Sequence, residues 1–455
     1  MSFTASTSQL PEILGLSSPA FTISPSSRLM GINTDTRTLQ PGEAFLALQG
    51  ETFDGHHFLE AAADKGAEAL IISRYSDRPL QETIPQFLVE DTLQAYQKIG
   101  SWWRDRFKIP IIGITGSVGK TTTKELISAV LTTKGKVLKT RKNYNNEIGV
   151  PKTLLELSGD DDYAVVEMAM RGAGQIAELT EIARPTVRVI TNVGTAHIGL
   201  LGSREAIARA KCELLATIPD DSIAILNADN ELLMKTAAEV WRGETITYGL
   251  EKGDLRGEIR DRQTLRVEGQ DFPLPLLGSH NASNYLAALA VAKVLAVDWQ
   301  PLLSGLAVEL PKGRAKRDDL EGNVTLLDET YNAGFESMVA ALRLLKETPA
   351  QRHLAVLGTM KELGEKSAEL HQKVGETARE LALDRVIILT DDSQAEAIAI
   401  GSRGIPTVCA TTHDEAIAVL KKEVRSGDCL LFKASNSVGL NRVVEQFKTE
   451  WEASF

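Results

Sequence analysis

The sequence predicts an α/β protein with three domains. Its 455 residues are enough for about three domains of ordinary size. Apolar strand-like segments alternate with longer helix-like segments over residues 108–311 and again over residues 312–455, and this alternation predicts parallel sheets covered by helices. Residues 1–107 carry shorter strand-like segments, which predict a small α/β domain.

The elements of the first two domains follow from the same apolar pattern. In residues 1–107 the strand candidates are AFLAL and ALIISR, and the first of them lies inside the glycine-rich segment PGEAFLALQGETFDGHHF. The central domain alternates buried strands with helices, in the order PIIGIT, TTKELISAVLTTKG, YAVVEMAM, PTVRVITNVG, SREAIARAKCELLATI and SIAILNA. A strand-rich section over residues 245–277 then precedes the helix NASNYLAALAVAKVLA.

The boundary between the second and third domains lies in PKGRAKR, residues 311–317, whose glycine and charges are typical of a hinge. Beyond it the alternation returns with VTLLDE, HLAVLG, RVIILTD, PTVCAT and CLLFKAS. These segments predict a second open α/β sheet of the Rossmann-like kind.

Composition and charge exclude several classes of protein. A hydrophobic content of 43% and a charged content of 24% are typical of a soluble globular protein. The net charge of −11 argues against nucleic acid or an anionic membrane as the main partner. Cys212, Cys409 and Cys429 are far apart and odd in number, which argues against both a disulfide framework and a zinc cluster. The N-terminal MSFTASTSQLPEIL lacks the pattern of a signal peptide, and no apolar run is long enough to span a membrane, so we expect a cytoplasmic protein without membrane insertion.

The segment IIGITGSVGKTTTKE, residues 111–125, predicts a nucleotide triphosphate site. Gly113, Gly116 and Gly119 permit a tight turn whose backbone N–H groups point at an oxyanion, while Lys120 and the start of the next helix add positive potential. The spacing departs from the usual G-x-x-x-x-G-K-[ST], because Ile114 stands where the first glycine is expected. A chance glycine turn is the alternative.

Several polar residues stand directly after apolar runs, where open parallel sheets bind ligands. Glu167 ends AVVE and could hold Mg²⁺ against nucleotide phosphates, or it could be a helix-capping or solvated carboxylate. His197 follows VITNVGTA and is either a ligand or a structural loop histidine. Asp328 ends VTLL, and Arg314 lies in the hinge; both complete the candidate set.

Lys211 lies in the middle of an apolar stripe on a helix predicted over about residues 203–218. The stripe is formed by Ile207, Ala208, Leu214 and Leu215. Burial would lower the pKa of the lysine and make a neutral, nucleophilic amine available. The alternative is a snorkelling lysine, whose stem packs while its ammonium group reaches water.

Two segments rich in asparagine could present amide groups to a ligand. NYNNEIGVPKTLL, residues 143–155, is a poor helix former before its proline and can also be a plain turn. GSHNASNYLAA places Asn281 and Asn284 at a helix start, where one of them could act only as an N-cap.

Taken together, the motifs resemble one family. GITGSVGKTT, NNEIGVPKTLL, EMAMRGAGQI, TNVGTAHIG, AKCELL, NADN, GSHNASN, PKGR, LLDETYNAG and LGTMKELGEKS occur in the order found in the ATP-dependent Mur ligases of bacterial cell-wall synthesis. The resemblance covers nearly the whole chain and includes TDTRTLQPGEAFLALQGETFDGHHF, which is similar to the UDP-sugar-binding module of the family. It is strongest to the members that join D-alanyl-D-alanine to UDP-N-acetylmuramoyl-tripeptide (UDP-MurNAc-tripeptide).

The resemblance implies a role for each matching residue. It implies that ATP is bound by Gly113, Thr115, Gly116, Ser117, Val118, Gly119, Lys120, Thr121, Thr122, Asn146, Asn281, Asn284, Arg314 and Asp328. It implies catalytic roles for Lys120, Lys211, Glu167 and His197, and two magnesium ions held by Thr121, Glu167, His197 and Lys211, the last as a carbamate. Thr36 and Arg37 are implied to bind the UDP-muramoyl end.

The resemblance also implies the reaction. The terminal carboxylate of the tripeptide attacks the γ-phosphate of ATP, and the amine of D-alanyl-D-alanine then attacks the acyl phosphate. The partners are therefore ATP, UDP-MurNAc-tripeptide and D-alanyl-D-alanine, and we expect a monomer. The residues do not identify the base for the incoming amine, nor whether the tripeptide ends in diaminopimelate or lysine.

Two segments depart from the family pattern, and three other functions compete with this one. The usual Y-N-A-N-P-x-S-M is YNAGFESM here, with Gly334 and Phe335 replacing Asn and Pro, and the usual K-G-S-R is KASN, Lys433 to Asn436; both segments border the expected dipeptide site. Family members that add one amino acid to UDP-MurNAc-dipeptide carry a D-N-P-[RA] motif, which is absent. Folylpolyglutamate synthetase would not need residues 1–107, and a non-enzymatic P-loop switch would show N-K-x-D, which is also absent.

Overall fold

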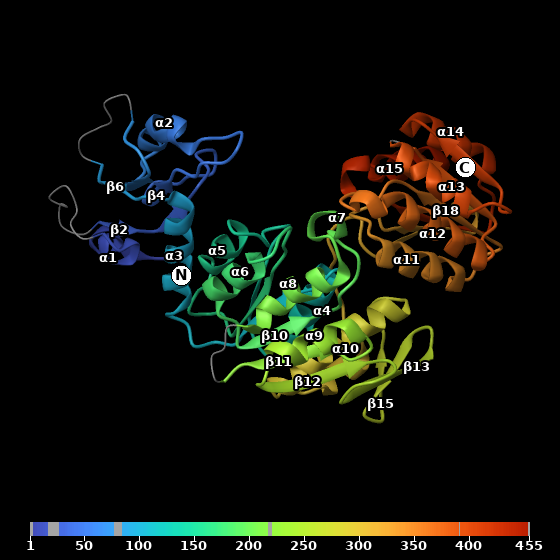
Figure 1. The fold of residues 1–455 in the computed structure, drawn as a ribbon, viewed down its shortest axis with the longest axis horizontal. Helices are drawn as coiled ribbons and strands as arrows, with labels where there is room; N and C mark the ends of the chain where they lie inside the picture. Colours follow the sequence, from blue (N-terminus) through green and yellow to red (C-terminus); the bar gives the residue numbers. More distant parts are fainter. Residues whose placement is uncertain (1–2, 17–26, 77–83, 217–220, 391, 454–455) are drawn as a thin grey trace.

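The computed structural model describes residues 3–16, 27–76, 84–216, 221–390 and 392–453. Three sheets of four or more strands follow one another along the chain, and in Figure 1 they form three separate bodies. The predicted α/β class is therefore confirmed. In the described part of the chain, no helix is both long and apolar enough to cross a bilayer.

The N-terminal body is a small parallel sheet. Its strands are β3 (Gly31–Asn33), β4 (Glu43–Leu46), β5 (Ala69–Ile72) and β6 (Gln86–Leu88), hydrogen-bonded in that order. Around it lie β1 (Ala5–Ser6), β2 (Arg28–Leu29), α1 (Leu10–Leu14), α2 (Leu59–Asp64) and α3 (Thr92–Arg104). The strands predicted from AFLAL and ALIISR are confirmed as β4 and β5, which are the apolar centre of this sheet.

The central body is built on a nine-stranded sheet with the order β15-β14-β13-β12-β11-β10-β7-β9-β8. Its strands are β7 (Ile111–Thr115), β8 (Val137–Lys139), β9 (Tyr163–Glu167), β10 (Val187–Ile190), β11 (Ile223–Asn227), β12 (Glu244–Gly249), β13 (Leu255–Asp261), β14 (Thr264–Val267) and β15 (Gln270–Pro273). Across the sheet, all neighbouring strands from β8 at one edge through β7 to β13 pair in parallel. The pairs β13–β14 and β14–β15 are antiparallel.

Helices cover both faces of this sheet, as the alternation predicted. They are α4 (Lys120–Thr132), α5 (Gly149–Leu154), α6 (Gln175–Ala183), α7 (Ile198–Leu201), α8 (Arg204–Ala216), α9 (Glu231–Val240) and α10 (Ser279–Val294). Alternate residues of the strands enter two separate cores, since Ile112 and Ile114 pack with α4 and α10 while Ile111 packs with α6 and α8. The predicted end of α8, at Ile218, lies outside the described residues.

The C-terminal body is a six-stranded sheet with the order β16-β17-β21-β18-β19-β20, in which β16 is an antiparallel edge strand and the others are parallel. Its elements are β16 (Lys316–Leu320), β17 (Val324–Asp328), α11 (Phe335–Glu347), β18 (Arg352–Leu357), α12 (Ser367–Glu380), β19 (Arg385–Leu389), α13 (Glu396–Gly401), β20 (Thr407–Ala410), α14 (His413–Glu423), β21 (Asp428–Lys433) and α15 (Asn441–Glu452). The last residue of the predicted strand RVIILTD, Asp391, lies outside the described residues.

Short 3-10 turns complete the list of elements. They are η1 (Thr7–Gln9), η2 (Gly55–Phe58), η3 (Gln300–Ser304), η4 (Glu321–Asn323), η5 (Gly364–Lys366), η6 (Ser393–Ala395) and η7 (Asn436–Val438).

The predicted hinge between the last two bodies is shorter than its motif, because Lys316 and Arg317 already belong to β16. In the turn just before that strand, Gly313 has a φ of +74°, a conformation that favours glycine.

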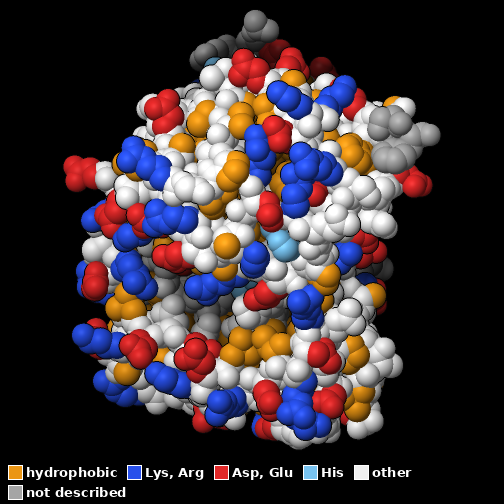
Figure 2. Space-filling view, turned by 90° about the vertical axis from the view of Figure 1, so that its right-hand side faces the viewer, with side chains coloured by type: hydrophobic (Ala, Val, Ile, Leu, Met, Phe, Trp, Pro, Cys, Tyr) orange, Lys and Arg blue, Asp and Glu red, His pale blue; other side chains and the backbone are white. Residues whose placement is uncertain are grey.

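The sheet order decides where a ligand can bind. β7 lies between β9 and β10, so the glycine turn after β7 meets the carboxyl ends of both neighbours. The short helix α7 extends from this edge towards the C-terminal body, and α7 and η5 are in contact (Figure 1). On the face drawn in Figure 2, acidic and basic side chains are interspersed rather than separated into one broad basic surface.

Candidate active site

The turn after β7 requires glycine at two of its positions. Gly116 has a φ of +155° and Gly119 a φ of +82°. A Cβ atom on Gly116 would lie 1.9 Å from Thr191 Oγ1, and one on Gly119 would lie 2.7 Å from Asn284 Oδ1. Gly113 was expected to shape the same turn, and that expectation is wrong: it lies inside β7, where a Cβ atom would come within 2.9 Å of Pro185. Its role is close packing of the sheet.

The turn offers its N–H groups unevenly. The N–H groups of Ser117 and Val118 donate to the main-chain oxygen and to Oδ1 of Asn192, at 3.0 Å each, so the protein already engages them. The N–H groups of Gly119, Lys120 and Thr121 donate to no acceptor in the described residues, as is usual in the first turn of a helix. An anion would therefore bind at the start of α4.

Lys120 lies against this anion position. Its Nζ atom donates to the main-chain oxygen of Gly116 at 2.7 Å. Burial lowers the pKa of Lys120, the carboxylate of Glu167 acts in the opposite direction, and the charge of Arg314 lowers it further. A bound phosphate group would supply negative charge beside Lys120. This charge would offset the cost of burying the ammonium group and its repulsion by Arg314.

Glu167 is held in one orientation by groups from two segments, α4 and the chain before α5. Its Oε2 atom accepts from Thr121 Oγ1 at 2.9 Å, its Oε1 atom accepts from Asn145 Nδ2 at 2.9 Å, and Lys124 Nζ lies 3.8 Å from Oε2. The side chain is 2% exposed, so the alternative of a solvated carboxylate is wrong. The buried Thr121–Glu167 pair brings a hydroxyl and a carboxylate together beside the glycine turn.

The asparagine that reaches this pair is Asn145, which we did not predict. The predicted Asn146 is exposed, and its Oδ1 atom accepts from the N–H of Gly149 at 3.0 Å at the start of α5. The two residues are adjacent in the NNEIG motif, so the pattern points to the segment without choosing between them. In the turn before α5, the side chain of Asn145 is directed to Glu167 and the side chain of Asn146 to the start of α5.

His197 joins the central and C-terminal bodies. It adopts a left-handed conformation with a φ of +66°, and its Nδ1 atom lies 2.6 Å from Glu362 Oε2. Burial lowers the pKa of His197, Glu362 counteracts this, and the charges of Lys120 and Lys211 add to the lowering. In the part of the chain that is described, Nε2 takes no hydrogen bond, so this atom of the ring is open to a ligand.

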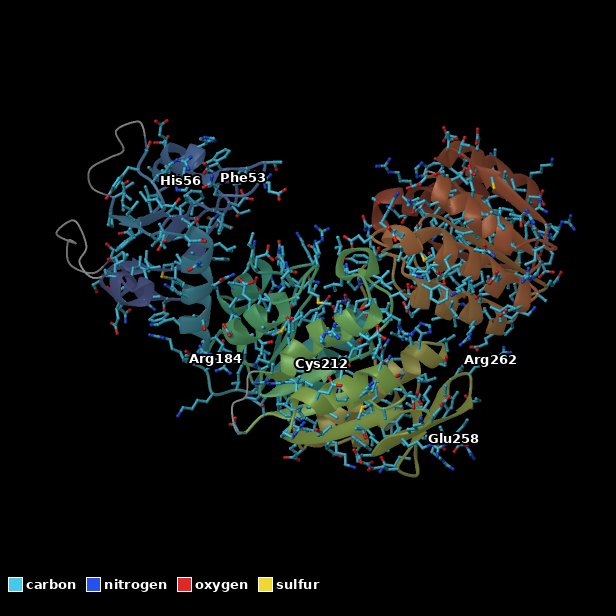
Figure 3. The ribbon with its side chains drawn as sticks, viewed as in Figure 1. Phe53, His56, Arg184, Cys212, Glu258 and Arg262 are labelled. Carbon is cyan, nitrogen blue, oxygen red and sulfur yellow. The ribbon has the colours of Figure 1, made fainter. Side chains whose placement is uncertain are left out.

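Lys211 is buried on α8 together with the apolar stripe that predicted it. The residue is 1% exposed, so the snorkelling alternative is wrong. Burial holds its pKa well below the ordinary value, and the charge of Lys120 contributes to the lowering. Among the described residues, none forms a hydrogen bond or ion pair with Nζ. Figure 3 labels the next residue, Cys212, within the central body.

Two predicted residues come from the C-terminal body. The guanidinium of Arg314 lies 3.9 Å from the centre of the Tyr331 ring, and its buried Nε atom has no hydrogen-bond partner among the described residues. Asp328 ends β17, where its Oδ1 atom accepts from the N–H and hydroxyl of Thr330 at 3.0 and 2.6 Å. Thr115, at the end of β7, likewise buries an Oγ1 atom that no described residue pairs with. Unpaired buried donors near a phosphate cradle fit a polar ligand better than an empty apolar site.

Asn281 and Asn284 are buried on α10 behind the turn. Asn284 Oδ1 accepts from Thr123 Oγ1 at 3.2 Å and, as noted above, lies against Gly119, whereas Asn281 Nδ2 donates to the main-chain oxygen of Leu277 at 2.8 Å. The N-cap of α10 is Gly278, so the alternative in which one asparagine is an N-cap is wrong. Thr122, another predicted residue, is buried on the first turn of α4.

Thr36 and Arg37 lie in the N-terminal body, in the connection between β3 and β4. Arg37 is exposed and pairs with Asp35, with Nε to Oδ1 at 2.9 Å and Nη2 to Oδ2 at 2.7 Å. The hydrogen bonds from Arg37 lower the pKa of Asp35 to about 2. The main-chain oxygen of Thr36 accepts from Lys65 Nζ at 2.7 Å.

Comparisons with known proteins agree with this architecture. The family descriptions "Mur ligase family, catalytic domain", "Mur ligase middle domain" and "Mur ligase, glutamate ligase domain" match residues 28–99, 114–292 and 313–436. The UDP-N-acetylmuramoyl-tripeptide–D-alanyl-D-alanine ligase of Synechocystis sp. is 59% identical over 94% of both chains.

Two solved structures are similar over most of the chain. MurF from Acinetobacter baumannii superposes with a TM-score of 0.88 at 29% identity, covering 98% of this chain and 99% of that one. MurF ligase from Thermotoga maritima in complex with ADP superposes with a TM-score of 0.83 at 32% identity, covering 93% and 98%. The chain therefore belongs to the Mur ligase family, on the branch of the UDP-N-acetylmuramoyl-tripeptide–D-alanyl-D-alanine ligases.

Proposed function

We propose that this chain is an ATP-dependent ligase that joins D-alanyl-D-alanine to UDP-MurNAc-tripeptide in peptidoglycan precursor synthesis. The products are UDP-MurNAc-pentapeptide, ADP and phosphate. The observation that carries the proposal is the buried pair of Thr121 and Glu167, 2.9 Å apart, beside Lys120 and the glycine turn. The names of the Synechocystis relative and of the ADP-bound Thermotoga structure support it.

The chemistry asks the protein mainly to position groups and to neutralise charge. A carboxylate oxygen of the tripeptide attacks the γ-phosphorus of ATP, the bond to the β–γ bridging oxygen breaks, and ADP leaves. The amine nitrogen of the dipeptide then attacks the acyl carbon, phosphate leaves, and the new amide loses a proton. Lys120, Arg314 and the N–H groups at the start of α4 would bind the phosphate oxygens.

The donor set fits magnesium. Thr121 and Glu167 offer a hydroxyl and a carboxylate, which are the oxygen ligands that Mg²⁺ prefers, and His197 offers its Nε2 atom. In the described ranges, no group of three or more His, Cys, Asp or Glu side chains could hold a metal ion, so phosphate oxygens and water would supply the remaining ligands. When bound, Mg²⁺ would neutralise charge that develops on the transferred phosphoryl group.

We further propose that Lys211 works as a carbamate. Its neutral amine nitrogen would bond to the carbon of CO₂ and release a proton, and the uncharged amine would become a carbamate whose negative charge can hold a second Mg²⁺. The buried Nζ atom, which has no hydrogen-bond or ion-pair partner among the described residues, supports this. Labelled bicarbonate should give a carbamate carbon signal in nuclear magnetic resonance that Lys211→Arg removes. Near-normal turnover of Lys211→Arg would contradict the proposal, and formate should restore part of the rate of Lys211→Ala.

The three bodies would divide the substrates. Residues 1–107, with Thr36 and Arg37, would bind UDP-MurNAc-tripeptide; residues 108–311 would bind ATP; and residues 312–455 would bind the dipeptide and complete the nucleotide site. Because the nucleotide residues come from a single chain, we propose that the protein acts as a monomer, in the cytoplasm where ATP is available. Light scattering of the purified protein and cell fractionation test these two points.

A substrate panel scored by ADP release tests the function. The wild-type protein receives ATP and Mg²⁺ with UDP-MurNAc-tripeptide ending in either lysine or diaminopimelate, with or without D-alanyl-D-alanine. We expect ADP release only when both acceptor and dipeptide are present, with a product whose mass is that of the pentapeptide. Equal release with UDP-MurNAc-dipeptide and a single free amino acid would overturn the assignment.

A further inference from the structure

Glu336 lies at the start of α11 in the C-terminal body, yet its carboxylate binds the central body. Its Oε1 atom accepts from the N–H of Thr195 at 2.7 Å, and its Oε2 atom accepts from Thr195 Oγ1 at 3.0 Å. A carboxylate at a helix N-terminus is also favoured by the helix dipole. The contact therefore uses both oxygens of a charged group and spans the two bodies.

The loop that Glu336 binds is in direct contact with the phosphate turn. The N–H of Gly194 donates to Ser117 Oγ at 2.8 Å, and Asn192 engages the N–H groups of Ser117 and Val118 as described above. A Cβ atom on Gly194 would lie 2.5 Å from Glu336 Cδ, so only glycine allows this approach. Residues 191–195 are thus hydrogen-bonded to the turn on one side and to α11 on the other.

The start of α11 is itself well anchored. Ser337 Oγ accepts from the N–H of Gly334 at 3.0 Å, and Asn436 Nδ2 donates to the main-chain oxygen of Tyr331 at 3.1 Å. Gly334 and Asn436 belong to the two segments that depart from the family pattern, and Glu336 stands at the variable position of the first. The departures therefore lie around one interdomain contact.

We infer that Glu336 is a positioning residue that couples the placement of the C-terminal body to the phosphate turn through residues 191–195. Docking of Glu336 on Thr195 orders the loop, and the loop orders Ser117 and Val118 next to the anion position. Coupling between sites is reciprocal, so a nucleotide that orders the turn must favour docking of the C-terminal body. The inference rests on the proposed function only for the identity of the ligands.

A second contact makes the inference testable without loss of the fold. Glu362 also crosses between the bodies, with His197 Nδ1 at 2.6 Å and Arg171 Nη2 at 3.3 Å. Removing the carboxylate of Glu336 should therefore weaken docking while the bodies stay joined. Glu336→Gln keeps the shape and one acceptor, whereas Glu336→Ala removes both acceptors.

The experiment measures ADP affinity by calorimetry and compaction by small-angle scattering, both with the full chain and without the dipeptide. We expect Glu336→Ala to weaken ADP binding roughly tenfold and to reduce compaction on adding ADP, with Glu336→Gln between Ala and wild type. Thr195→Val should weaken ADP binding less than Glu336→Ala does, because the N–H of residue 195 still donates to Glu336. The double variant should bind ADP as weakly as Glu336→Ala alone. The matched control is Glu380→Ala, an exposed glutamate at the end of α12 in the same body.

The outcomes separate this inference from the proposed function. ADP affinity of Glu336→Ala within twofold of wild type, at unchanged thermal stability, would overturn the coupling even if the wild-type enzyme passes the substrate panel. A purely structural role would lower the melting temperature and leave the ADP affinity of the folded variant unchanged. If the substrate panel fails but Glu336→Ala still weakens ADP binding, the coupling through Glu336 is supported and the proposed substrates are wrong.

Discussion

Replacing Lys211 with methionine should stabilise the protein while removing the proposed activity. The residue is 1% exposed, and within the described residues its Nζ atom has no hydrogen-bond or ion-pair partner. Burial, with the charge of Lys120, holds the pKa well below the ordinary value of 10.5, so folding favours the neutral amine. Methionine fills a similar volume without a polar group, and it cannot form a carbamate.

The size of the effect follows from the missing partner. Burying a polar group without a hydrogen bond costs about 1–3 kcal/mol in proteins, so Lys211→Met should raise the free energy of unfolding by at least this amount near neutral pH. The unfolded chain binds a proton that the folded chain releases, and this adds to the cost below the ordinary pKa of 10.5. The advantage of the variant should therefore shrink as the pH rises towards that value.

Urea unfolding followed by circular dichroism measures this in buffer free of bicarbonate, Mg²⁺ and nucleotide. The midpoint should rise with an unchanged slope, and calorimetry should show a rise of about 2–4 °C for each kcal/mol in a domain of this size. Lys235→Met, at an exposed position on α9, is the control and should stay within about 0.5 kcal/mol of wild type. A Lys211→Met variant that is no more stable than wild type would refute the reasoning, because Nζ would then have a partner in solution.

Two further predictions test the turn and its surroundings. Glu167→Gln and Thr121→Val should each lower the turnover of ADP release on the order of 10²-fold, while Thr121→Ser keeps the hydroxyl and most of the rate; equal rates for Val and Ser would contradict the role of the hydroxyl. Gly113→Ala should cost about 1–3 kcal/mol in urea unfolding, because a Cβ atom would lie 2.9 Å from Pro185. Gly172→Ala, where a Cβ atom has no neighbour within 4 Å, is the control, and equal losses for both would show that packing is not the cause.

The local pattern of the sequence is enough to predict the α/β class, the order of the central strands and helices, and the place of Lys211 in an apolar stripe. These properties depend on residues that are close in the chain. Helical periodicity alone places Lys211 in an apolar stripe of its helix. That its amine is buried rather than snorkelling follows from the packing of the fold, which leaves the residue 1% exposed. In the same way the glycines and Lys120 mark the turn, and Glu167 marks the end of a buried strand.

Which groups meet at the turn depends on contacts between distant parts of the chain. Asn192 lies 74 residues from Val118, and Glu336 lies 141 residues from Thr195, so no periodic pattern connects either pair. Their contacts exist because β10 lies beside β7 and because α11 reaches the loop after β10. For the same reason Gly113 proved to serve sheet packing against Pro185. Hydrogen-bond partners of this kind follow from sheet order and domain placement, and one sequence carries no local signal for either.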